Sequence, residues 1–221
     1  MIKSPEKSNE KTYLSFHDRL LSLPDLFSLN GMTRHFSMDR QVARNCLKEW
    51  KKKGYIEPFG FRTSWYFNTL KNKKAKEDKW YNALQEIYPE AVHGGVNEIR
   101  QAGWMTQISP KEEVIVRNRL RYYQVDEVEW MPRSVYWFRR YHDGITSDGP
   151  RRKLSPEYAL VDLCEAGKYI PDPDDLFLDE TEVLKIKDAF AKLKVDIPQK
   201  LWEVLEYDPQ NSLKSTKTAR P

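Results

Sequence analysis

The spacing of apolar and polar positions predicts three helices in the first part of the chain. The first covers residues 12–23 and is ended by Pro24, and the second is a short helix over about residues 25–31. The third begins at Ser37, a residue type that favours the N-cap position. Its core-facing stripe is predicted from apolar residues four positions apart, namely Val42, Cys46 and Trp50, with Ala43 and Leu47 beside them.

The third helix is expected to end at Gly54, because three lysines precede this glycine and cations favour a helix C-terminus. The apolar period then changes to two. Residues 55–59 and 61–67 flank Gly60 and are predicted to be the strands of a short hairpin. Three helices followed by a hairpin is the order of a winged helix-turn-helix, which we assign to residues 12–69.

The rest of the chain predicts a second, larger domain. Lysine-rich residues 70–79 are interpreted as a basic linker, and residues 80–206 as an α+β domain with an antiparallel sheet and C-terminal helices. Residues 1–11 and 207–221 are expected to be disordered. Helices are predicted at residues 80–88, 92–102, 181–193 and 198–206, and from Ser155-Pro156-Glu157 onward, and strands at 113–116, 122–130 and 133–141.

Charge is distributed unevenly along the sequence. Residues 1–79 hold 17 Lys and Arg against 9 Asp and Glu, whereas residues 80–221 hold 20 against 24. A basic front part joined to a mildly acidic remainder indicates a polyanionic partner for the front part alone.

The location expected for the protein is the cytoplasm. No apolar run reaches the ~20 residues that span a bilayer, and the polar first residues lack a signal-peptide core. Cys46 and Cys164 lie far apart and outside any metal-binding or redox motif. They are interpreted as small, buried side chains in a reducing compartment.

The polar side of the third helix carries residue types that recognise DNA. Arginine pairs with guanine edges, and glutamine and asparagine pair with adenine. The expected base-reading residues are Arg40, Gln41 and Arg44, followed by Asn45. Phosphate contacts are expected from Lys48, Lys51 and Lys52, and a phosphate or minor-groove contact from Arg62 near the hairpin tip. We predict that this face binds double-stranded DNA; the alternative is an amphipathic helix with a solvated basic face.

Candidate enzymatic chemistry is sparse in this sequence. His93 precedes Gly94-Gly95 without the lysine of a phosphate loop, so these glycines are interpreted as a helix-start turn. Acidic residues could hold a divalent ion, but the acid-spacer-acid-x-lysine order of a nuclease strand is missing. The acidic residues considered are Asp126, Glu127, Glu129, Glu157 and Asp162. We expect no enzyme activity, metal or cofactor, with a metal-dependent nuclease as the least favoured alternative.

Two segments resemble a known family. The Tyr-Pro-Glu-Ala-Val-His-Gly-Gly stretch at residues 88–95 resembles an "Ala-Leu-x-x-His-Gly" stretch, and residues 154–163 resemble a "Pro-Glu-x-Ala-Leu-x-Asp" helix start. With the order of the domains, they make residues 12–206 similar to the AbiEi antitoxins of type IV toxin–antitoxin systems.

The resemblance implies an antitoxin that represses its own operon through its N-terminal domain. Its C-terminal domain would counteract a nucleotidyltransferase-like toxin, without need of a stable complex, in phage defence by abortive infection. The residues themselves leave open a plain winged-helix regulator whose C-terminal domain senses a ligand or dimerises.

Overall fold

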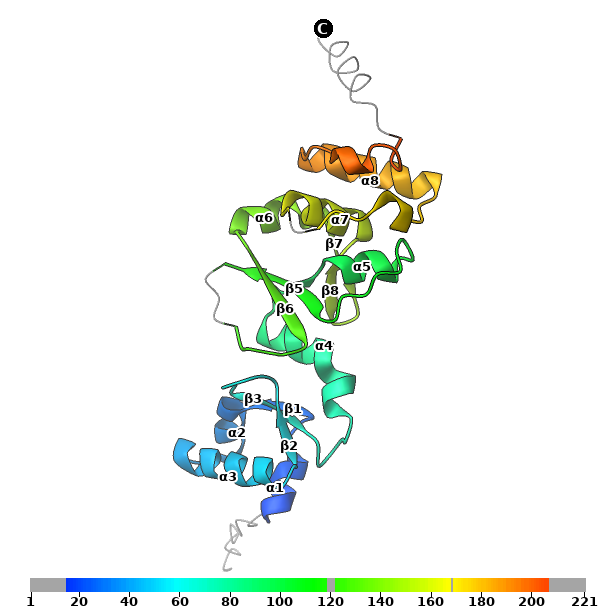
Figure 1. The fold of residues 1–221 in the computed structure, drawn as a ribbon. Helices are drawn as coiled ribbons and strands as arrows, with labels where there is room; N and C mark the ends of the chain where they lie inside the picture. Colours follow the sequence, from blue (N-terminus) through cyan, green and yellow to red (C-terminus); the bar gives the residue numbers. More distant parts are fainter. Residues whose placement is uncertain (1–14, 119–121, 168, 207–221) are drawn as a thin grey trace, which may run out of the picture. The chain divides into compact units, whose positions relative to one another are not determined.

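The computed structural model describes residues 15–118, 122–167 and 169–206 (Figure 1). The chain divides into two compact units, Met1–Ala83 and Leu84–Pro221. Both contain helices and a sheet, which confirms the α+β class. The predicted disordered ends, residues 1–11 and 207–221, lie outside the described residues.

The first unit places a three-stranded sheet beside three helices. Its elements are α1 (Phe16–Ser22), β1 (Leu26–Ser28), α2 (Leu29–Phe36), α3 (Arg40–Lys52), β2 (Ile56–Pro58) and β3 (Trp65–Asn68). Strand β3 pairs antiparallel with β2 and also with β1, in the order β1-β3-β2. The predicted hairpin is therefore present, and Gly54 has the left-handed conformation (φ 71°) expected after a helix.

Strand β1 corrects the prediction of a helix over residues 25–31. Leu26–Ser28 pairs with β3, and the helix begins only at Leu29, where the Ser28 hydroxyl accepts a hydrogen bond from Gly31 N at 3.0 Å. The three residues of β1 obtain their backbone partners from β3, about 40 positions further on, so local spacing could not indicate the strand.

The start of α3 also differs from the prediction. Ser37 does not cap α3; it ends α2 in the left-handed region, with φ 48°. Asp39 is the N-cap, and its carboxylate accepts hydrogen bonds from Gln41 N (2.6 Å) and Val42 N (3.4 Å). Residues 37–39 thus form a three-residue turn between α2 and α3.

The buried stripe of α3 consists of Ala43, Leu47 and Trp50. They pack with Leu20, Phe27, Leu29, Met32 and Ile56. The prediction was wrong for Val42, which is 47% exposed, while Cys46 is partly buried against the same core. Both triplets have helical spacing, and only the position of the other elements decides which one is buried.

The segment predicted as a linker is partly helical. Helix α4 runs over Ala75–Ile87, and its start belongs to the first unit because Trp80 stacks on Phe59 with ring centroids 5.0 Å apart. Lys76 also pairs with Glu57 at 2.9 Å. The division between the units therefore falls within α4, after Ala83, and not at residues 70–79.

The second unit has a five-stranded mixed sheet in the order β6-β5-β4-β8-β7. Its strands are β4 (Val92–His93), β5 (Glu112–Arg117), β6 (Val128–Arg133), β7 (Ile145–Asp148) and β8 (Arg151–Leu154). The pairs β4–β5 and β7–β8 are antiparallel, but β4–β8 and β5–β6 are parallel, so the expected antiparallel sheet is corrected to a mixed one. Strands β7 and β8 were not predicted.

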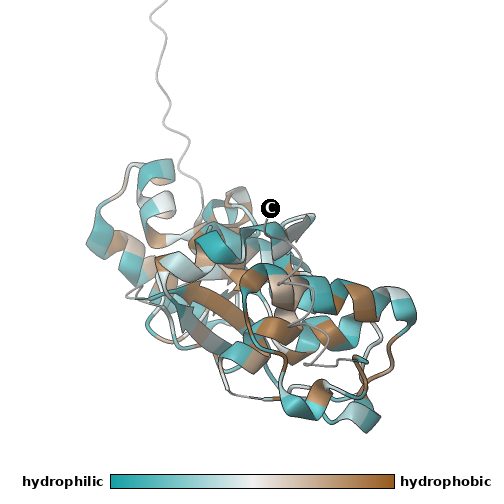
Figure 2. Ribbon diagram, turned by 90° about the horizontal axis from the view of Figure 1, so that it is seen from above, coloured by the Kyte–Doolittle hydropathy of each residue, from teal (hydrophilic) through white to brown (hydrophobic). Residues whose placement is uncertain are grey.

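The second unit also contains helices that pack with the sheet or with one another. They are α5 (Val96–Gln101), α6 (Val135–Arg140), α7 (Pro156–Glu165) and α8 (Glu180–Leu193), with short 3-10 turns at His142–Gly144, Pro173–Asp175 and Gln199–Leu201. Figure 1 shows α7 between the sheet and α8, and the hydropathy colours of Figure 2 show helices with one hydrophobic and one hydrophilic side. The core joins Ile115 and Met131 of the sheet to Leu160 and Phe190 of these helices.

Two helix starts in this unit agree with the sequence and four segments do not, one of them the predicted strand at residues 122–130, of which only residues 128–130 lie in β6. Ser155 is the N-cap of α7 with proline following, and α8 covers the predicted 181–193. Residues 92–102 split into β4 and α5, and residues 198–206 contain only a short 3-10 turn. Residues 133–141, predicted as a strand, contain α6. Ser134 caps this helix by accepting a hydrogen bond from Trp137 N at 3.2 Å, and the rings of Trp137 and Tyr141 stack with their centroids 4.5 Å apart.

Candidate nucleic-acid interface

The exposed side of α3 collects seven of the eight residues predicted to contact DNA. At about 100° per residue, these positions span a sector of about 140° around the helix axis. The sector contains Arg40, Gln41, Arg44, Asn45, Lys48, Lys51 and Lys52, all of them exposed. Glu49, the acidic residue of α3, lies outside it. Five cations and two amides therefore share one acid-free face of the helix.

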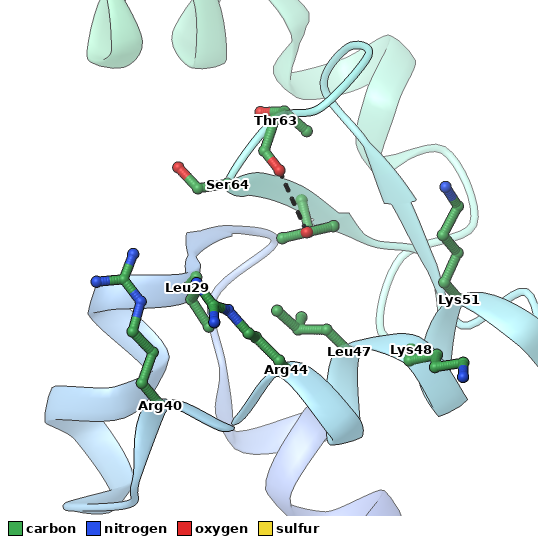
Figure 3. Close-up of a pocket in the computed structure, with 9 residues that line it drawn as sticks. Leu29, Arg40, Arg44, Leu47, Lys48, Lys51, Thr63 and Ser64 are labelled. Atoms are coloured by element: carbon green, nitrogen blue, oxygen red, sulfur yellow. Dashed lines mark hydrogen bonds between the residues drawn. The ribbon is translucent and has the colours of Figure 1, made fainter. Parts of the chain in front are cut away.

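Part of this face borders an open hollow of about 450 Å³ (Figure 3). Arg40, Arg44, Lys48 and Lys51 line it from α3, and Thr63, Ser64 and Tyr66 line it from the hairpin. Leu29 and Leu47 form the apolar part of its lining. Cationic side chains of α3 and hydroxyl side chains of the hairpin therefore line the same hollow, although the two segments lie about 20 positions apart in the sequence.

Backbone contacts hold the hairpin side of this hollow. Leu29 N donates to Ser64 O at 2.8 Å, which ties the start of α2 to the hairpin. The Tyr66 hydroxyl donates to Thr63 O at 3.3 Å, and Trp65 N donates to the Thr63 hydroxyl at 3.0 Å. The hydroxyl residues of the hollow could not be predicted from the sequence, since their spacing indicated only a strand.

The two amides of the sector contact each other. Gln41 Nε2 donates to Asn45 Oδ1 at 3.3 Å, as side chains four positions apart on a helix can. This contact orients one amide by means of the other on the solvent side of α3. The nearby carboxylate of Asp39 accepts two backbone N–H groups of α3, so part of its negative charge is compensated locally.

Arg62 lies apart from the hollow, at the turn of the hairpin. Its backbone is left-handed (φ 55°), and its guanidinium lies 5.1 Å from the centroid of the Phe61 ring. Phe61 is 64% exposed. The hairpin tip therefore presents an aromatic ring and a cation together.

Asp162, considered from the sequence as a metal ligand, accepts hydrogen bonds from other side chains of the second unit. Its carboxylate is 1% exposed and accepts hydrogen bonds from Arg133 Nε (3.0 Å), Arg133 Nη2 (2.9 Å) and Trp137 Nε1 (2.7 Å). Within residues 15–118, 122–167 and 169–206, no three His, Cys, Asp or Glu side chains are grouped so that they could hold a metal ion.

A buried polar cluster joins three strands and a helix in the second unit. Arg151 of β8 pairs with Glu98 of α5, and it donates to Gln101 at 2.7 Å. Glu112 of β5 lies 3.4 Å from His93 Nδ1. Burial raises the pKa of Glu98 to about 7, with Arg151 opposing the shift, and burial lowers the pKa of His93. These groups are 1–8% exposed apart from Glu112 and Gln101, so we assign the cluster to packing.

The glycines after His93 form a helix-start turn, as predicted. Gly95 is the N-cap of α5 with φ 71°, and a Cβ atom there would lie 2.3 Å from the Glu113 carboxylate. That carboxylate accepts a hydrogen bond from Val96 N at 2.7 Å. Glu113 therefore occupies the space that any other residue at this position would need.

The two cysteines are free thiols, and both are partly buried, so they are less buried than the sequence indicated. Burial raises the pKa of Cys164 to about 12, which disfavours the reactive thiolate. None of the helices in the described part of the chain has the length and apolar content that crossing a membrane requires.

Comparison with known proteins adds little to this geometry. No family model and no curated protein matches the chain. Among solved structures, the chain is similar to the RV2827C protein from Mycobacterium tuberculosis, with a TM-score of 0.45 and 11% sequence identity. The likeness covers 92% of this chain and 73% of that one. A likeness at this level carries no functional argument.

Proposed function

We propose that the first unit is a winged helix-turn-helix that binds double-stranded DNA, with α3 in the major groove and the β2–β3 hairpin as the wing. Two helices joined by a three-residue turn match the helix-turn-helix, in which the second helix reads the bases. An α-helix about 10–12 Å across fits a major groove about 12 Å wide. The observation that carries the proposal is the exposed, acid-free face of α3.

The chemistry of this face supports both affinity and specificity. Its five cations, with Arg62 at the wing tip, can replace counterions along the phosphate backbone, which favours binding to any duplex. Arg40, Gln41 and Arg44 lie in the first turns of the helix, the part that reaches base edges in helix-turn-helix proteins. Lys48, Lys51 and Lys52 lie nearer its C-terminus, where backbone contacts are expected.

The class of protein we propose is therefore a DNA-binding transcription regulator without enzymatic activity or cofactor. Within that class we propose an antitoxin of the AbiEi type, which represses its own operon and counteracts a nucleotidyltransferase-like toxin through the second unit. The support is the resemblance of residues 154–163, the start of α7, and the order of the two units. Such an antitoxin acts in the cytoplasm and needs no stable complex with the toxin.

DNA binding is tested with the full chain and a pool of random duplexes. Repeated selection should enrich one sequence motif, and fluorescence anisotropy should show that Arg44→Ala weakens binding to that motif. Arg139→Ala, which removes an exposed arginine of the second unit, is the matched control and should leave binding unchanged. Failure to enrich any motif would overturn the proposal of sequence-specific binding.

The antitoxin role is tested separately. The proposal expects a neighbouring gene for a nucleotidyltransferase-like toxin, and the full chain is expressed together with the product of that gene. The wild-type chain should restore growth, and Arg44→Ala should restore growth while losing repression of the operon promoter. If the chain binds DNA but does not restore growth, the antitoxin role is rejected in favour of a transcription regulator without antitoxin activity. Magnesium-dependent cleavage of the selected duplex would support a nuclease instead.

A further inference from the structure

The hollow between α3 and the hairpin is cationic along its α3 side. Every polar residue that α3 contributes to its lining is a cation, namely Arg40, Arg44, Lys48 and Lys51. The amides Gln41 and Asn45 belong to the other edge of the sector, about 100–140° around the helix axis from Arg40. Among the described residues that line the hollow there is no carboxylate. Negative charge placed in the hollow is therefore stabilised by α3.

Tyr66 contributes to the opposite side of the hollow. It lies in the central strand β3, where it pairs with Phe27 of β1 and with Pro58 of β2. Its ring packs against the core of the first unit, with its centroid 6.0 Å from that of Phe27. Strand pairing on both sides and packing of the ring therefore fix the place at which the tyrosine hydroxyl meets the hollow.

The Tyr66 hydroxyl makes a long hydrogen bond within the hairpin. It donates to Thr63 O at 3.3 Å (dashed line in Figure 3), whereas most O–H···O hydrogen bonds in proteins measure about 2.7–2.8 Å. A bond of this length is weak, so the hydrogen can be donated instead to a better acceptor that enters the hollow. Beside four cations, the acceptor that gains most is an anionic oxygen, because hydrogen bonds to ionised acceptors are shorter and stronger.

A DNA strand carries anionic oxygens of this kind at each phosphate, and tyrosine hydroxyls are among the protein groups that bind them. We propose that the hollow holds one backbone phosphate of the bound duplex, which accepts a hydrogen bond from the Tyr66 hydroxyl and lies beside the ammonium group of Lys51. This inference rests on the proposed DNA binding and adds a residue of the sheet to the contacts of α3. A phosphate held by α3 and β3 together fixes how α3 lies in the groove, and the edge with Gln41 and Asn45 is then left to the bases.

Methylphosphonate substitution tests this contact, because it replaces one anionic phosphate oxygen by a methyl group and removes the charge. The duplex enriched by selection with the full chain is prepared with each phosphate substituted in turn, and binding is measured by anisotropy. Tyr66→Phe, which keeps the ring, should bind the unmodified duplex about tenfold more weakly, as expected for one hydrogen bond to a charged group.

The decisive readout is the position of the sensitive phosphate. At one phosphate, substitution should weaken binding by the wild-type chain strongly and binding by Tyr66→Phe much less, and Lys51→Ala should lose its sensitivity at the same phosphate. Tyr66→Phe should also keep the wild-type slope of log K against log salt, because a neutral hydroxyl displaces no counterion. A change in folding stability alone would not single out one phosphate.

Tyr136→Phe is the matched control, since Tyr136 is 69% exposed on α6 of the second unit. It should respond to each substituted phosphate as the wild type does. Equal losses of the wild type and Tyr66→Phe at every phosphate overturn the inference while DNA binding stands, and so does a loss of sensitivity at different phosphates in Tyr66→Phe and Lys51→Ala. If those losses are equal and inorganic phosphate raises the Tm of the wild type but not that of Tyr66→Phe, the hollow binds a small phosphate ligand instead. Absence of binding to any duplex overturns the proposed function and this inference together.

Discussion

Arg133 and Asp162 form a two-point ion pair inside the second unit, with Nε and Nη2 of the arginine 3.0 and 2.9 Å from the two carboxylate oxygens. The pair connects the end of β6 to α7, and Trp137 of α6 donates to the same carboxylate. A side chain that sequence analysis considered as a metal ligand thus joins three elements of the fold.

Removal of this carboxylate should destabilise the second unit strongly. Asp162→Ala leaves the largely buried Arg133 guanidinium without its partner, and breaking a buried pair in this way costs about 3–5 kcal/mol. Thermal unfolding followed by tryptophan fluorescence measures the loss. Asp188→Ala, which removes an exposed carboxylate paired with Lys192 on α8, is the control and should cost less than about 1 kcal/mol. Equal effects of the two changes would contradict a structural role of the buried pair.

The buried Glu98 should make stability depend on pH. Burial raises its pKa to about 7 in the folded protein, above the unfolded value near 4.5. The folded state therefore binds the proton more tightly, so this contribution is fully present below about pH 4.5 and is lost as the pH rises through 7. His93, whose pKa is lowered, contributes in the opposite sense, because its stabilisation is lost as the pH falls below about 6.5.

Glu98→Gln separates these two effects. The amide keeps an acceptor for Arg151 but does not titrate, so only the opposite contribution of His93 remains, and the stability of the variant should rise relative to that of the wild type between pH 5 and pH 8. Urea unfolding at both pH values measures the difference in the free energy of unfolding. Glu203→Gln, an exposed change, should follow the wild type. A wild-type-like pH dependence in Glu98→Gln would assign the effect to another group.

Gly95→Ala should cost more than the left-handed conformation alone explains. Gly95 has φ 71° and ψ −156°, a backbone conformation almost confined to glycine that costs another residue about 1–3 kcal/mol, and the added Cβ also clashes with the Glu113 carboxylate. Gly149→Ala is the matched control, with φ 57° and open space around the Cβ position. The difference between the two free energies of unfolding reports the clash together with the rarer backbone conformation of Gly95. Similar values for both variants would show that Glu113 moves aside freely.

The salt dependence of DNA binding should distinguish the two kinds of contact on α3. Lys51→Ala should weaken binding to selected and random duplexes alike and reduce the slope of log K against log salt by about 0.9, the value for one phosphate contact. Arg44→Ala should weaken binding to the selected duplex by ~1–3 kcal/mol and random duplexes far less. Anisotropy titrations at several salt concentrations provide both quantities. Equal effects of Arg44→Ala on both duplexes would contradict base reading by this residue.

The exposed cationic face of α3 shows how much the local sequence pattern can predict. The charged and amide positions of α3 could be assigned from spacing alone, because helical geometry puts residues three and four apart on one side. The buried side was partly misassigned, since Val42 and Ala43 are both apolar and differ only in what packs against them. Local spacing cannot distinguish them.

In the second unit, the local pattern of apolar and polar residues gives wrong predictions of helices and strands. Trp137 and Tyr141 lie in an alternating sequence that predicts a strand, yet they stack on the same side of one helix because Asp162 and the core around α7 hold Trp137 in place. Strands β7 and β8 are short and polar, and they become strands because β8 pairs with β4, about 60 positions earlier in the chain.

The amino-acid sequence by itself determined the helix ends that depend on neighbouring residues, such as Ser155 before α7 and Gly54 after α3, and the concentration of positive charge in the first unit. Tertiary structure alone decided which apolar face of α3 is buried, which segments pair as strands, and that four cations of α3 share a hollow with Thr63 and Ser64. The reason is that capping and charge act over a few residues, whereas burial and strand pairing depend on segments that meet only when the chain folds.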